Sequence, residues 1–398
     1  MGFAKHLYPS SGSPVSPNTV NEHSPRNDHT LRSRLERLLD NADVKINSNR
    51  PWDMQVHNPA LYPRLFAHGS LGLGEAYMDG WWDSDSLDGF FARVLRADLA
   101  GRVATWRDGL AAFKARLFNH QSISRAFQVS KQHYDIGNKL YQRMLDKRMI
   151  YSCAYWRRAN SLDEAQEAKL DVVCRKMDLK PGMRLLDIGC GWGGMAAYAA
   201  EKYGVEVLGI TISREQAAYA AEKYTDLPVT IKMQDYRKLT GTFDRIISLG
   251  MFEHVGYKNY RIFMKNVRRL LRHDGLALLH TIGNNKTTNT TDEWINRYIF
   301  PNSMLPSAKQ ISAAAEGLFV IEDWHNFGAD YDTTLMHWFR NFDKYWPELQ
   351  GPEYDARFYR MWKYYLLACA GSFRARVNQL WQLVLSPMGC INGYCAPR

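Results

Sequence analysis

Short apolar runs alternate with helical stretches over the later part of the chain. The runs that predict strands are Leu185–Ile188, Val205–Ile212, Val229–Met233, Phe243–Leu249, Leu276–Thr281 and Val320–Trp324. Helical spacing of apolar residues occurs over Leu162–Met177, Met195–Tyr203, Ser213–Tyr224 and Asn259–Leu271. Strands that alternate with helices favour an α/β fold with a doubly wound, mainly parallel sheet. Ligands in such sheets bind beyond the carboxyl ends of the strands, so we expect one site built from several loops.

A glycine-rich turn follows the first of these strands. The sequence Asp187-Ile-Gly-Cys-Gly-Trp-Gly-Gly194 interrupts the apolar run, and a helix begins at Met195. Glycines let the backbone approach a ligand closely at a helix N-terminus. The spacing G-x-G-x-G-G differs from the dinucleotide fingerprint, and Asp187 is placed to hold a charged amino-acid group. The pattern resembles motif I of the S-adenosylmethionine-dependent methyltransferases, and a plain tight turn is the alternative.

The first part of the chain predicts a separate, mostly helical unit. Residues 1–30 are polar and rich in Pro and Ser, so we expect them to be disordered. We expect a small domain over residues 31–118, a basic linker at 119–130 and an α/β domain over 131–398. Within the small domain, the pattern predicts helices at 31–39, 87–95 and 106–118 and short strands at 44–46 and 54–56. The glycines of Gly69–Trp82 lack the Lys-Ser/Thr of a phosphate loop.

Composition and charge narrow the classes of function. The 51 Lys and Arg against 41 Asp and Glu give a formal charge of +10, which suits nucleic acid or an anionic lipid surface. Basic residues are dense between Arg102 and Arg148, where a solvated basic face is the alternative. No nucleic-acid motif accompanies them, so we expect no nucleic-acid partner. No apolar run approaches the ~20 residues of a membrane span, so we expect a soluble, cytoplasmic protein.

The cysteines predict neither disulfides nor a metal site. They stand at positions 153, 174, 190, 369, 390 and 395. None forms the C-x-x-C pair typical of zinc sites, and a chain of 398 residues needs no disulfide to stabilise its core. Reduced thiols are therefore expected.

Seven motifs in order carry a more specific resemblance. They are His133-Tyr-Asp-Ile-Gly-Asn138, Ile150-Tyr-Ser-Cys-Ala-Tyr-Trp156, the glycine-rich turn, Gly209-Ile-Thr-Ile-Ser213, Gly250-Met-Phe-Glu-His-Val-Gly256, Leu279-His-Thr-Ile-Gly283 and Asn326-Phe-Gly-Ala-Asp-Tyr-Asp-Thr-Thr-Leu335. Together with Gly69–Trp82 they resemble bacterial cyclopropane-fatty-acyl-phospholipid synthases over about residues 31–386. The resemblance implies a Rossmann-like class I methyltransferase fold with a small, mostly helical N-terminal domain that docks on lipid.

The activity implied by the resemblance is methylene transfer. The cis double bond of an unsaturated acyl chain, still in its membrane phospholipid, takes a methyl group from S-adenosylmethionine, and the resulting carbocation loses a proton and closes to a cyclopropane. Such a site has to hold a sulfonium, tolerate a carbocation and exclude water. The implied partners are the phospholipid bilayer surface, its unsaturated acyl chains and a second copy in a homodimer. The implied location is the inner face of the membrane, with peripheral attachment.

For S-adenosylmethionine, the pattern of the family falls on four segments. The matching positions are Tyr151, Ser152, Asp187, Gly189, Cys190, Gly191, Trp192, Gly193, Thr211, Ile212, Ser213, Gln216, Gln234, Asp235 and Tyr236. Thr211 and Gln216 stand where many methyltransferases place an acidic residue for the ribose. Ser213 is expected to cap the next helix, with Gln216 completing a capping box. Asp235 has the alternative role of a helix cap or turn former.

For proton removal, the family holds a bicarbonate ion. The matching positions are Cys153, Glu253, His280, the backbone of Ile282, and Tyr331. An ion with donor and acceptor faces needs a His or Tyr donor, a backbone N–H and a carboxylate. From residue types alone, Glu253 has the alternative role of a structural carboxylate that answers His254 or a basic neighbour. For His280, residue types alone favour a satisfied core histidine. Tyr331 is hard to explain as core because its neighbours are polar.

A further site position is Cys369, which matches a cysteine long labelled as active-site in the family. Its apolar neighbours, including Leu366 and Leu367, favour a buried and inert thiol. The chemistry implied by the resemblance needs no thiolate nucleophile, so we expect Cys369 near the site without a role in bond formation.

Two other classes of function are open at this point. The first alternative is an enzyme with the same fold and cofactor but another product. Relatives in the same superfamily leave a methyl branch, add a hydroxyl or methylate small amines. A basic nucleic-acid or lipid-binding protein with a degenerate cofactor pocket is the non-enzymatic alternative. An RNA methyltransferase would usually carry a base-binding motif such as N-P-P-Y, which this sequence lacks. The segment Gly69–Trp82 and the set at the proton-removal site favour ring formation.

Overall fold

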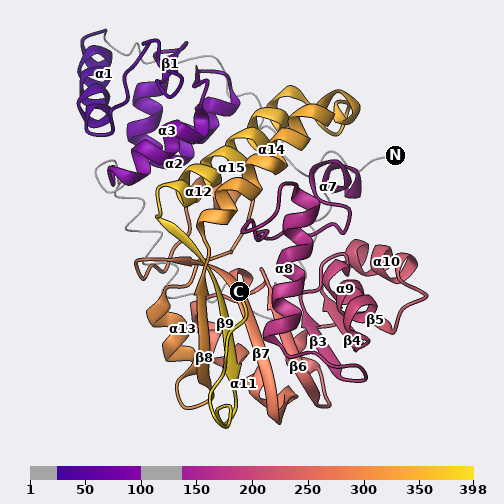
Figure 1. Ribbon diagram of the computed structural model, residues 1–398. Helices are drawn as coiled ribbons and strands as arrows, with labels where there is room; N and C mark the ends of the chain where they lie inside the picture. The colour runs from indigo at the N-terminus through magenta and orange to yellow at the C-terminus, as the bar shows by residue number, and fades with distance from the viewer. Residues whose placement is uncertain (1–24, 100–136) are drawn as a thin grey trace.

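A seven-stranded sheet forms the centre of the computed structural model, which describes residues 25–99 and 137–398 (Figure 1). The strands lie in the order β5-β4-β3-β6-β7-β9-β8. Pairing is parallel from β5 to β7, and β9 runs antiparallel to both β7 and β8. The strands are β3 Arg184–Ile188, β4 Glu206–Thr211, β5 Val229–Met233, β6 Phe243–Leu249, β7 Leu271–Asn284, β8 Val320–Asn326 and β9 Asn378–Ser386. The expected α/β fold with a mainly parallel sheet is confirmed.

Helices cover both faces of this sheet. The helices of residues 137–398 are α7 Asn138–Met144, α8 Leu162–Lys176, α9 Gly194–Tyr203, α10 Arg214–Lys223, α11 Tyr260–Leu270, α12 Glu293–Tyr298, α13 Ala308–Ala315, α14 Ala329–Leu349 and α15 Ala356–Arg374. Of these, α8 and α9 pack on one face of the sheet and α11 and α13 on the other, whereas α14 and α15 pack together. Short 3-10 turns are η2 Tyr236–Lys238, η3 Phe252–His254 and η4 Tyr257–Asn259. Successive residues of a strand point to opposite faces. Leu185 therefore packs with Val173 of α8 on one face, whereas Leu186 packs with Phe263 of α11 on the other.

The front helices form one continuous core with the end of the chain. They are α1 Pro25–Asp40, α2 Leu61–Met78 and α3 Leu87–Arg96, with the two-residue strands β1 Gln55–Val56 and β2 Trp82–Asp83 between them. Helix α15 packs against α2 and α3, and α14 packs against α15 (Figure 1). Trp82, Phe91 and Tyr364 of α15 are buried in a shared cluster. The helical region expected at the N-terminus is present, and its domain boundaries stay predictions.

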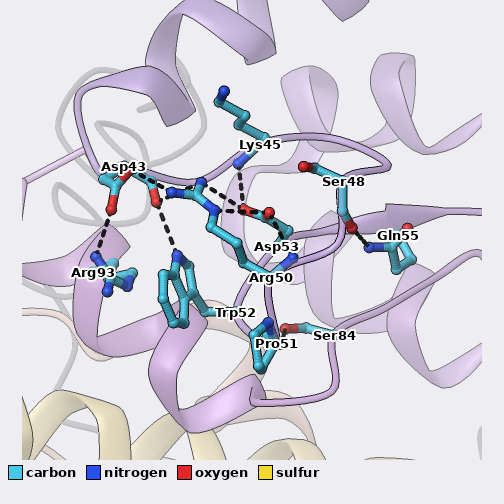
Figure 2. A network of polar contacts seen from close by, with 10 residues as sticks. All are labelled: Asp43, Lys45, Ser48, Arg50, Pro51, Trp52, Asp53, Gln55, Ser84 and Arg93. Carbon is cyan, nitrogen blue, oxygen red and sulfur yellow. Dashed lines mark hydrogen bonds and ion pairs between the residues drawn. The ribbon is translucent and has the colours of Figure 1, made fainter.

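The loop between α1 and α2 is fixed by ion pairs (Figure 2). The Asp53 carboxylate is almost completely buried and accepts from the backbone N–H of Lys45 at 2.8 Å. Arg50 bonds both Asp53, at 2.8 Å, and Asp43, at 2.6 Å. Buried charges of this kind are stable only when paired. The network shapes the loop, and nothing in it is aimed at a ligand.

The glycines of Gly69–Trp82 serve helix packing. Gly69 interrupts α2 with a positive φ of 53°. A Cβ at Gly74 would lie 2.4 Å from the Trp294 ring, and one at Gly72 would lie 2.4 Å from the carbonyl oxygen of Arg64. The absence of a side chain at Gly74 therefore lets α2 pack directly against α12, whereas at Gly72 it lets the two parts of the kinked α2 approach each other.

Several expectations on the chain's edges differ from the structure. Helix α1 begins at Pro25, so it includes the last six residues of the segment expected to be disordered. Residues 44–46 form no strand, and only Ile46 makes an isolated bridge to Met54. Strand β9 was missed because a short apolar run such as Leu380–Leu385 cannot be told from helix by periodicity. The remaining head, the helix at 106–118 and the linker at 119–130 lie outside the described residues.

Within residues 25–99 and 137–398, no helix is both long and apolar enough to cross a membrane.

The packing of α15 on α3 generates the first prediction. A Cβ at Gly371 would lie 2.7 Å from the Asp88 carbonyl oxygen and 2.7 Å from the Phe91 Cβ. Replacing a helical glycine by alanine usually stabilises a protein by about 0.5–1 kcal/mol, but overpacking costs about 1–3 kcal/mol. We expect Gly371→Ala to lower the free energy of unfolding, measured by urea denaturation.

The matched control is Gly351→Ala, in the loop between α14 and α15. The nearest atom to a Cβ at Gly351 is 3.9 Å away, so this change has room and is expected to be neutral. Equal stability of the two variants would contradict the close backbone contact.

Candidate active site

A pocket opens at the carboxyl ends of β3, β4, β5 and β6. Its wall includes most of the residues expected to bind the cofactor: Tyr151, Ser152, Asp187, Gly189, Cys190, Gly191, Trp192, Thr211, Ile212, Gln216, Gln234, Asp235 and Tyr236. Residues of two later segments complete it, namely Gly250, Met251, His254, Val255, Pro301 and Asn302. Parallel strands present their loops at one edge, which explains why segments far apart in sequence meet here. Gly193 and Ser213 do not line the pocket.

The glycine-rich turn needs its glycines for conformation. Gly189, Gly191 and Gly193 have φ values of 83°, 54° and 81°, a region that other residues rarely adopt. The backbone N–H groups of Gly189 and Cys190 both donate to the carbonyl oxygen of Ile210, at 2.9 and 3.0 Å. The turn is thereby tied to β4, and Gly193 acts as the N-cap of α9.

Asp187 brings a buried carboxylate to the pocket. It lies near the end of β3 and is 1% exposed. Among the described residues, its Oδ2 atom has no hydrogen-bond partner. Burial raises the pKa of Asp187 to about 7, and the charge of Lys169 partly opposes that shift. An unpartnered buried carboxylate oxygen on a pocket wall fits a ligand that carries a donor or a positive charge.

The loop after β4 differs in part from the expected capping box. Ser213 caps α10 by accepting from the backbone N–H of Gln216 at 3.3 Å. The reciprocal bond is not formed, because the Gln216 Oε1 atom accepts from the Thr211 hydroxyl at 2.9 Å instead. Thr211 and Gln216 are therefore held together on the pocket wall as a neutral polar pair, and Ser213 has a structural role.

Asp235, after β5, acts as a turn former. Its carboxylate accepts from the backbone N–H and the Nε of Arg237, both at 2.9 Å, and caps η2. Burial favours its neutral form, but the bonds from Arg237 prevail and hold the pKa of Asp235 below its usual value. The alternative of a turn former is thus realised, and the same side chain lines the pocket.

Glu253 lies in η3 and is bonded to β7. Its Oε1 accepts from the backbone N–H of Ile282 at 2.7 Å, and its Oε2 has no partner. Burial raises the pKa of Glu253 to about 7. Burial also lowers the pKa of His254 to about 4, so this neighbour is neutral and gives no counter-charge. No cation within the described residues forms an ion pair with Glu253, which argues against a purely structural carboxylate.

His280, on β7, has one free ring nitrogen. The Gln382 amide of β9 contacts Nδ1 at 3.2 Å, and Nε2 is buried without a partner. Burial, with help from the charges of Lys169 and Lys176, keeps the pKa of His280 well below its usual value. Because an amide nitrogen donates, Nδ1 accepts and the proton of the neutral ring lies on Nε2. His280 and Ile282 alternate with Thr281, so their side chains share one face.

Tyr331 packs tightly near the start of α14. Its ring lies 4.6 Å from Phe373 and 5.9 Å from Trp338, between centroids. Burial raises the pKa of Tyr331 well above its usual value, and the nearby groups Cys153, Glu253 and Cys369 raise it further. The structure therefore brings these four residues into one neighbourhood, with a phenol that stays protonated.

The two cysteines of the predicted site are poor nucleophiles. The Cys153 thiol is buried and donates to the Ala154 carbonyl oxygen at 3.1 Å. Burial raises the pKa of Cys153 well above its usual value and that of Cys369 to about 12. Since the thiolate is the reactive form, neither side chain is suited to covalent attack, as expected for Cys369.

Two residues of α8 were missed by sequence reasoning. Gln166 and Lys169 are buried beneath the loop that carries Tyr151 and Ser152. The Lys169 ammonium donates to the Ser152 hydroxyl at 2.9 Å, and the Gln166 amide donates to the Ser152 carbonyl oxygen at 2.9 Å. The sequence did offer a sign of both residues. Each stands on the apolar stripe of α8, where polar and charged side chains are uncommon, so their presence there indicates a buried polar contact.

Comparison with known proteins identifies relatives of this fold. The family model of mycolic acid cyclopropane synthetase matches residues 121–383. The cyclopropane-fatty-acyl-phospholipid synthase of Escherichia coli (strain K12) is 54% identical over 385 residues, which cover 96% of this chain and 100% of that protein. A probable fatty acid methyltransferase of Pseudomonas putida is 35% identical, covering 87% of this chain and 90% of its own.

Solved structures give the same family. The cyclopropane synthase MmaA2 from Mycobacterium tuberculosis has a TM-score of 0.61 at 30% identity and covers 65% of this chain and 97% of its own. The mycolic acid cyclopropane synthase CmaA1, solved in complex with SAH and CTAB, has a TM-score of 0.60 at 32% identity with the same coverage. The chain therefore belongs to the cyclopropane synthase family and is an S-adenosylmethionine-dependent methyltransferase.

Proposed function

We propose that the enzyme transfers a methylene group from S-adenosylmethionine to the cis double bond of unsaturated acyl chains in membrane phospholipids, which gives cyclopropane fatty acids. The full-length similarity to a cyclopropane-fatty-acyl-phospholipid synthase supports this substrate. The observation that carries the proposal is Glu253, a buried carboxylate fixed by the Ile282 amide with one oxygen free. Ring closure requires a proton acceptor that is shielded from water, and the Glu253 carboxylate would hold that acceptor in place.

The pocket at the strand ends fits S-adenosylmethionine. Asp187 offers a free acceptor for a charged group, the glycine-rich turn allows close approach of backbone, and Thr211 and Gln216 offer neutral polar contacts. When bound, the cofactor supplies the methyl carbon that becomes the ring methylene. These side chains then orient that carbon and keep it from water.

The neighbourhood of Glu253 fits a small oxyanion such as bicarbonate. Tyr331 and the His280 Nε2 atom are protonated donors, and the free Oε2 of Glu253 is an acceptor for a hydroxyl. The Ile282 amide already donates to Glu253, so it serves the ion chiefly by orienting that carboxylate. We propose that this set holds bicarbonate, which supplies the base for the proton lost at ring closure.

Aromatic side chains form the wall proposed for the acyl chain. The Tyr151 and Tyr365 hydroxyls are 2.8 Å apart, and the Tyr151 ring lies 5.1 Å from Trp338. A cation over an aromatic face gains about 0.5–2 kcal/mol. We propose that these rings stabilise the carbocation on the acyl chain and exclude the water that would quench it.

The proposal also covers membrane attachment, location and oligomeric state. We propose that the front helices dock on the phospholipid surface, that the enzyme acts at the inner face of the membrane, and that it forms a homodimer. The net charge of +10 supports attraction to anionic lipid.

Product analysis tests the proposal directly. The protein is incubated with vesicles of an unsaturated phospholipid and S-adenosylmethionine that carries a fully deuterated methyl group, and the acyl chains are examined by mass spectrometry. Ring formation is expected to leave two deuterium atoms in the product, since one is lost as the proton. A product that keeps all three would show a methyl branch, and an oxygenated product would show capture of the cation by water.

Loss of the free carboxylate should act on turnover. In Glu253→Gln, an amide replaces the acceptor and a donor faces the site, so we expect kcat to fall by about 100-fold or more. The dissociation constant of S-adenosylmethionine should change little, because Glu253 does not line the cofactor pocket. Turnover is measured with vesicles and binding by calorimetry. Glu206→Gln, an exposed change at the start of β4, is the matched control.

Tyr331→Phe removes a donor while keeping the ring that packs on Phe373. We expect a similar loss of kcat with unchanged cofactor affinity, and loss of the stimulation that added bicarbonate gives the unmodified enzyme in buffer freed of carbon dioxide. Near-normal turnover in either variant, or no response of the unmodified enzyme to bicarbonate, would contradict the assignment of the ion.

A further inference from the structure

Lys169 is a buried lysine without an ion pair. Its side chain is completely buried in α8, and no carboxylate within residues 25–99 and 137–398 forms an ion pair with its Nζ atom. Within the same residues, the ammonium donates a hydrogen bond to the Ser152 hydroxyl at 2.9 Å. Lysines are almost never buried unless paired, since an unpaired charge in the interior is costly. The burial of Lys169 therefore costs free energy, which indicates a function for this residue.

The surroundings of Lys169 point to the cofactor pocket. Ser152 and Asp187 both line that pocket, and the Asp187 Oδ2 atom is buried without a partner. One turn before Lys169, Gln166 donates to the carbonyl oxygens of Ile150 and Ser152, at 3.3 and 2.9 Å. Asp146 accepts from the backbone N–H of Ile150 at 2.9 Å. The loop that carries Tyr151 and Ser152 is thus held from beneath.

The electrostatic environment couples this lysine to the acid of the pocket. The groups that face Lys169 are Asp146 before the loop, Cys153 on the loop and Asp187 on β3, and His280 on β7 feels its charge. The groups that face Asp187 are Lys169 and the Cys190 thiol of the turn. Burial lowers the pKa of Lys169 to about 8, and the charges of Asp146, Cys153 and Asp187 oppose that shift in part. The lysine is therefore charged at neutral pH and favours a charged Asp187.

We infer that Lys169 is a positioning residue of the cofactor pocket: its ammonium fixes the Ser152 hydroxyl and, through its charge, keeps Asp187 a carboxylate that can receive the positively charged end of the ligand. The inference rests on the proposed binding of S-adenosylmethionine in this pocket. Lys169 would thus control whether Asp187 is ionised, although Lys169 itself does not line the pocket.

The test is the pH dependence of S-adenosylmethionine binding, measured by calorimetry on the full chain. In the unmodified enzyme, affinity should fall as pH drops through the pKa of Asp187, which is about 7. In Lys169→Met, an unbranched side chain that is one atom shorter replaces the lysine, and the charge is lost. The midpoint should therefore move upward by about one pH unit or more, and affinity at neutral pH should fall about fivefold or more, because the ionised fraction of Asp187 falls.

Two further variants separate charge from hydrogen bonding and from folding. Ser152→Ala removes the hydrogen bond and keeps the charge, so its affinity should fall while its midpoint stays. Lys176→Met removes the other buried lysine of α8, which pairs with Asp323 at 3.0 Å away from the pocket, and should change neither quantity. If Lys169→Met does not fold, the profile of the unmodified enzyme and Ser152→Ala still decide, because a flat profile or unchanged affinity in Ser152→Ala overturns the inference.

The failure of this inference is distinct from failure of the proposed function. An unmodified enzyme that does not bind S-adenosylmethionine at any pH would overturn both. An enzyme that binds it and forms the ring, with superimposable profiles for the unmodified protein and Lys169→Met, would overturn only the role of Lys169.

Discussion

The exclusion of water from polar groups is the constraint on which this site depends. The Asp187 Oδ2, Glu253 Oε2 and His280 Nε2 atoms are buried without hydrogen-bond partners. Each such atom costs about 1–3 kcal/mol, and all three belong to residues at or near the carboxyl ends of β3, β6 and β7. A fold tolerates this cost at one edge of its sheet when a ligand supplies the missing partners. The same dryness raises the pKa of both carboxyl groups to about 7, so their charge is easily changed by a neighbour.

One helix, α15, joins that dry edge to the front of the molecule. Its Gly371 lies against the backbone of α3, while Phe373 packs on Tyr331. Arg374 continues the connection, because it bonds Asp88 of α3 at 2.5 Å and Asp332 of α14 at 2.9 Å. The front helices are therefore part of the same packed unit as Tyr331, and a displacement of α3 would reach that residue through rigid contacts rather than through a flexible link.

Much of the fold followed from the sequence, since apolar runs and helical spacing report directly on which faces are buried. The six strands from 185 to 324 and the helices α8, α9, α10 and α11 were predicted this way, whereas α12 and α13 were not. Thirteen of the fifteen positions expected to bind the cofactor line the pocket. Other features depend on contacts between distant segments. Gly74 of α2 is explained only by its contact with Trp294, and the side chain of Gln216 turns to Thr211 rather than completing a cap. The role of Lys169 was not predicted, because the helical spacing of α8 does not indicate that Ser152, from another segment, contacts this lysine.

That lysine also shows why the pocket cannot be understood from its lining residues alone. A positive charge beside a site for a cationic ligand is unfavourable by itself, because like charges repel strongly where water is excluded. Without that charge, however, burial would leave Asp187 largely neutral at neutral pH, and a protonated acid is a weak partner for a cation. The hydrogen bond to Ser152 resolves the conflict by directing the ammonium toward a neutral hydroxyl on the loop. In the proposed arrangement, the ammonium favours the ionised form of the acid, and the Asp187 Oδ2 atom stays free for the ligand.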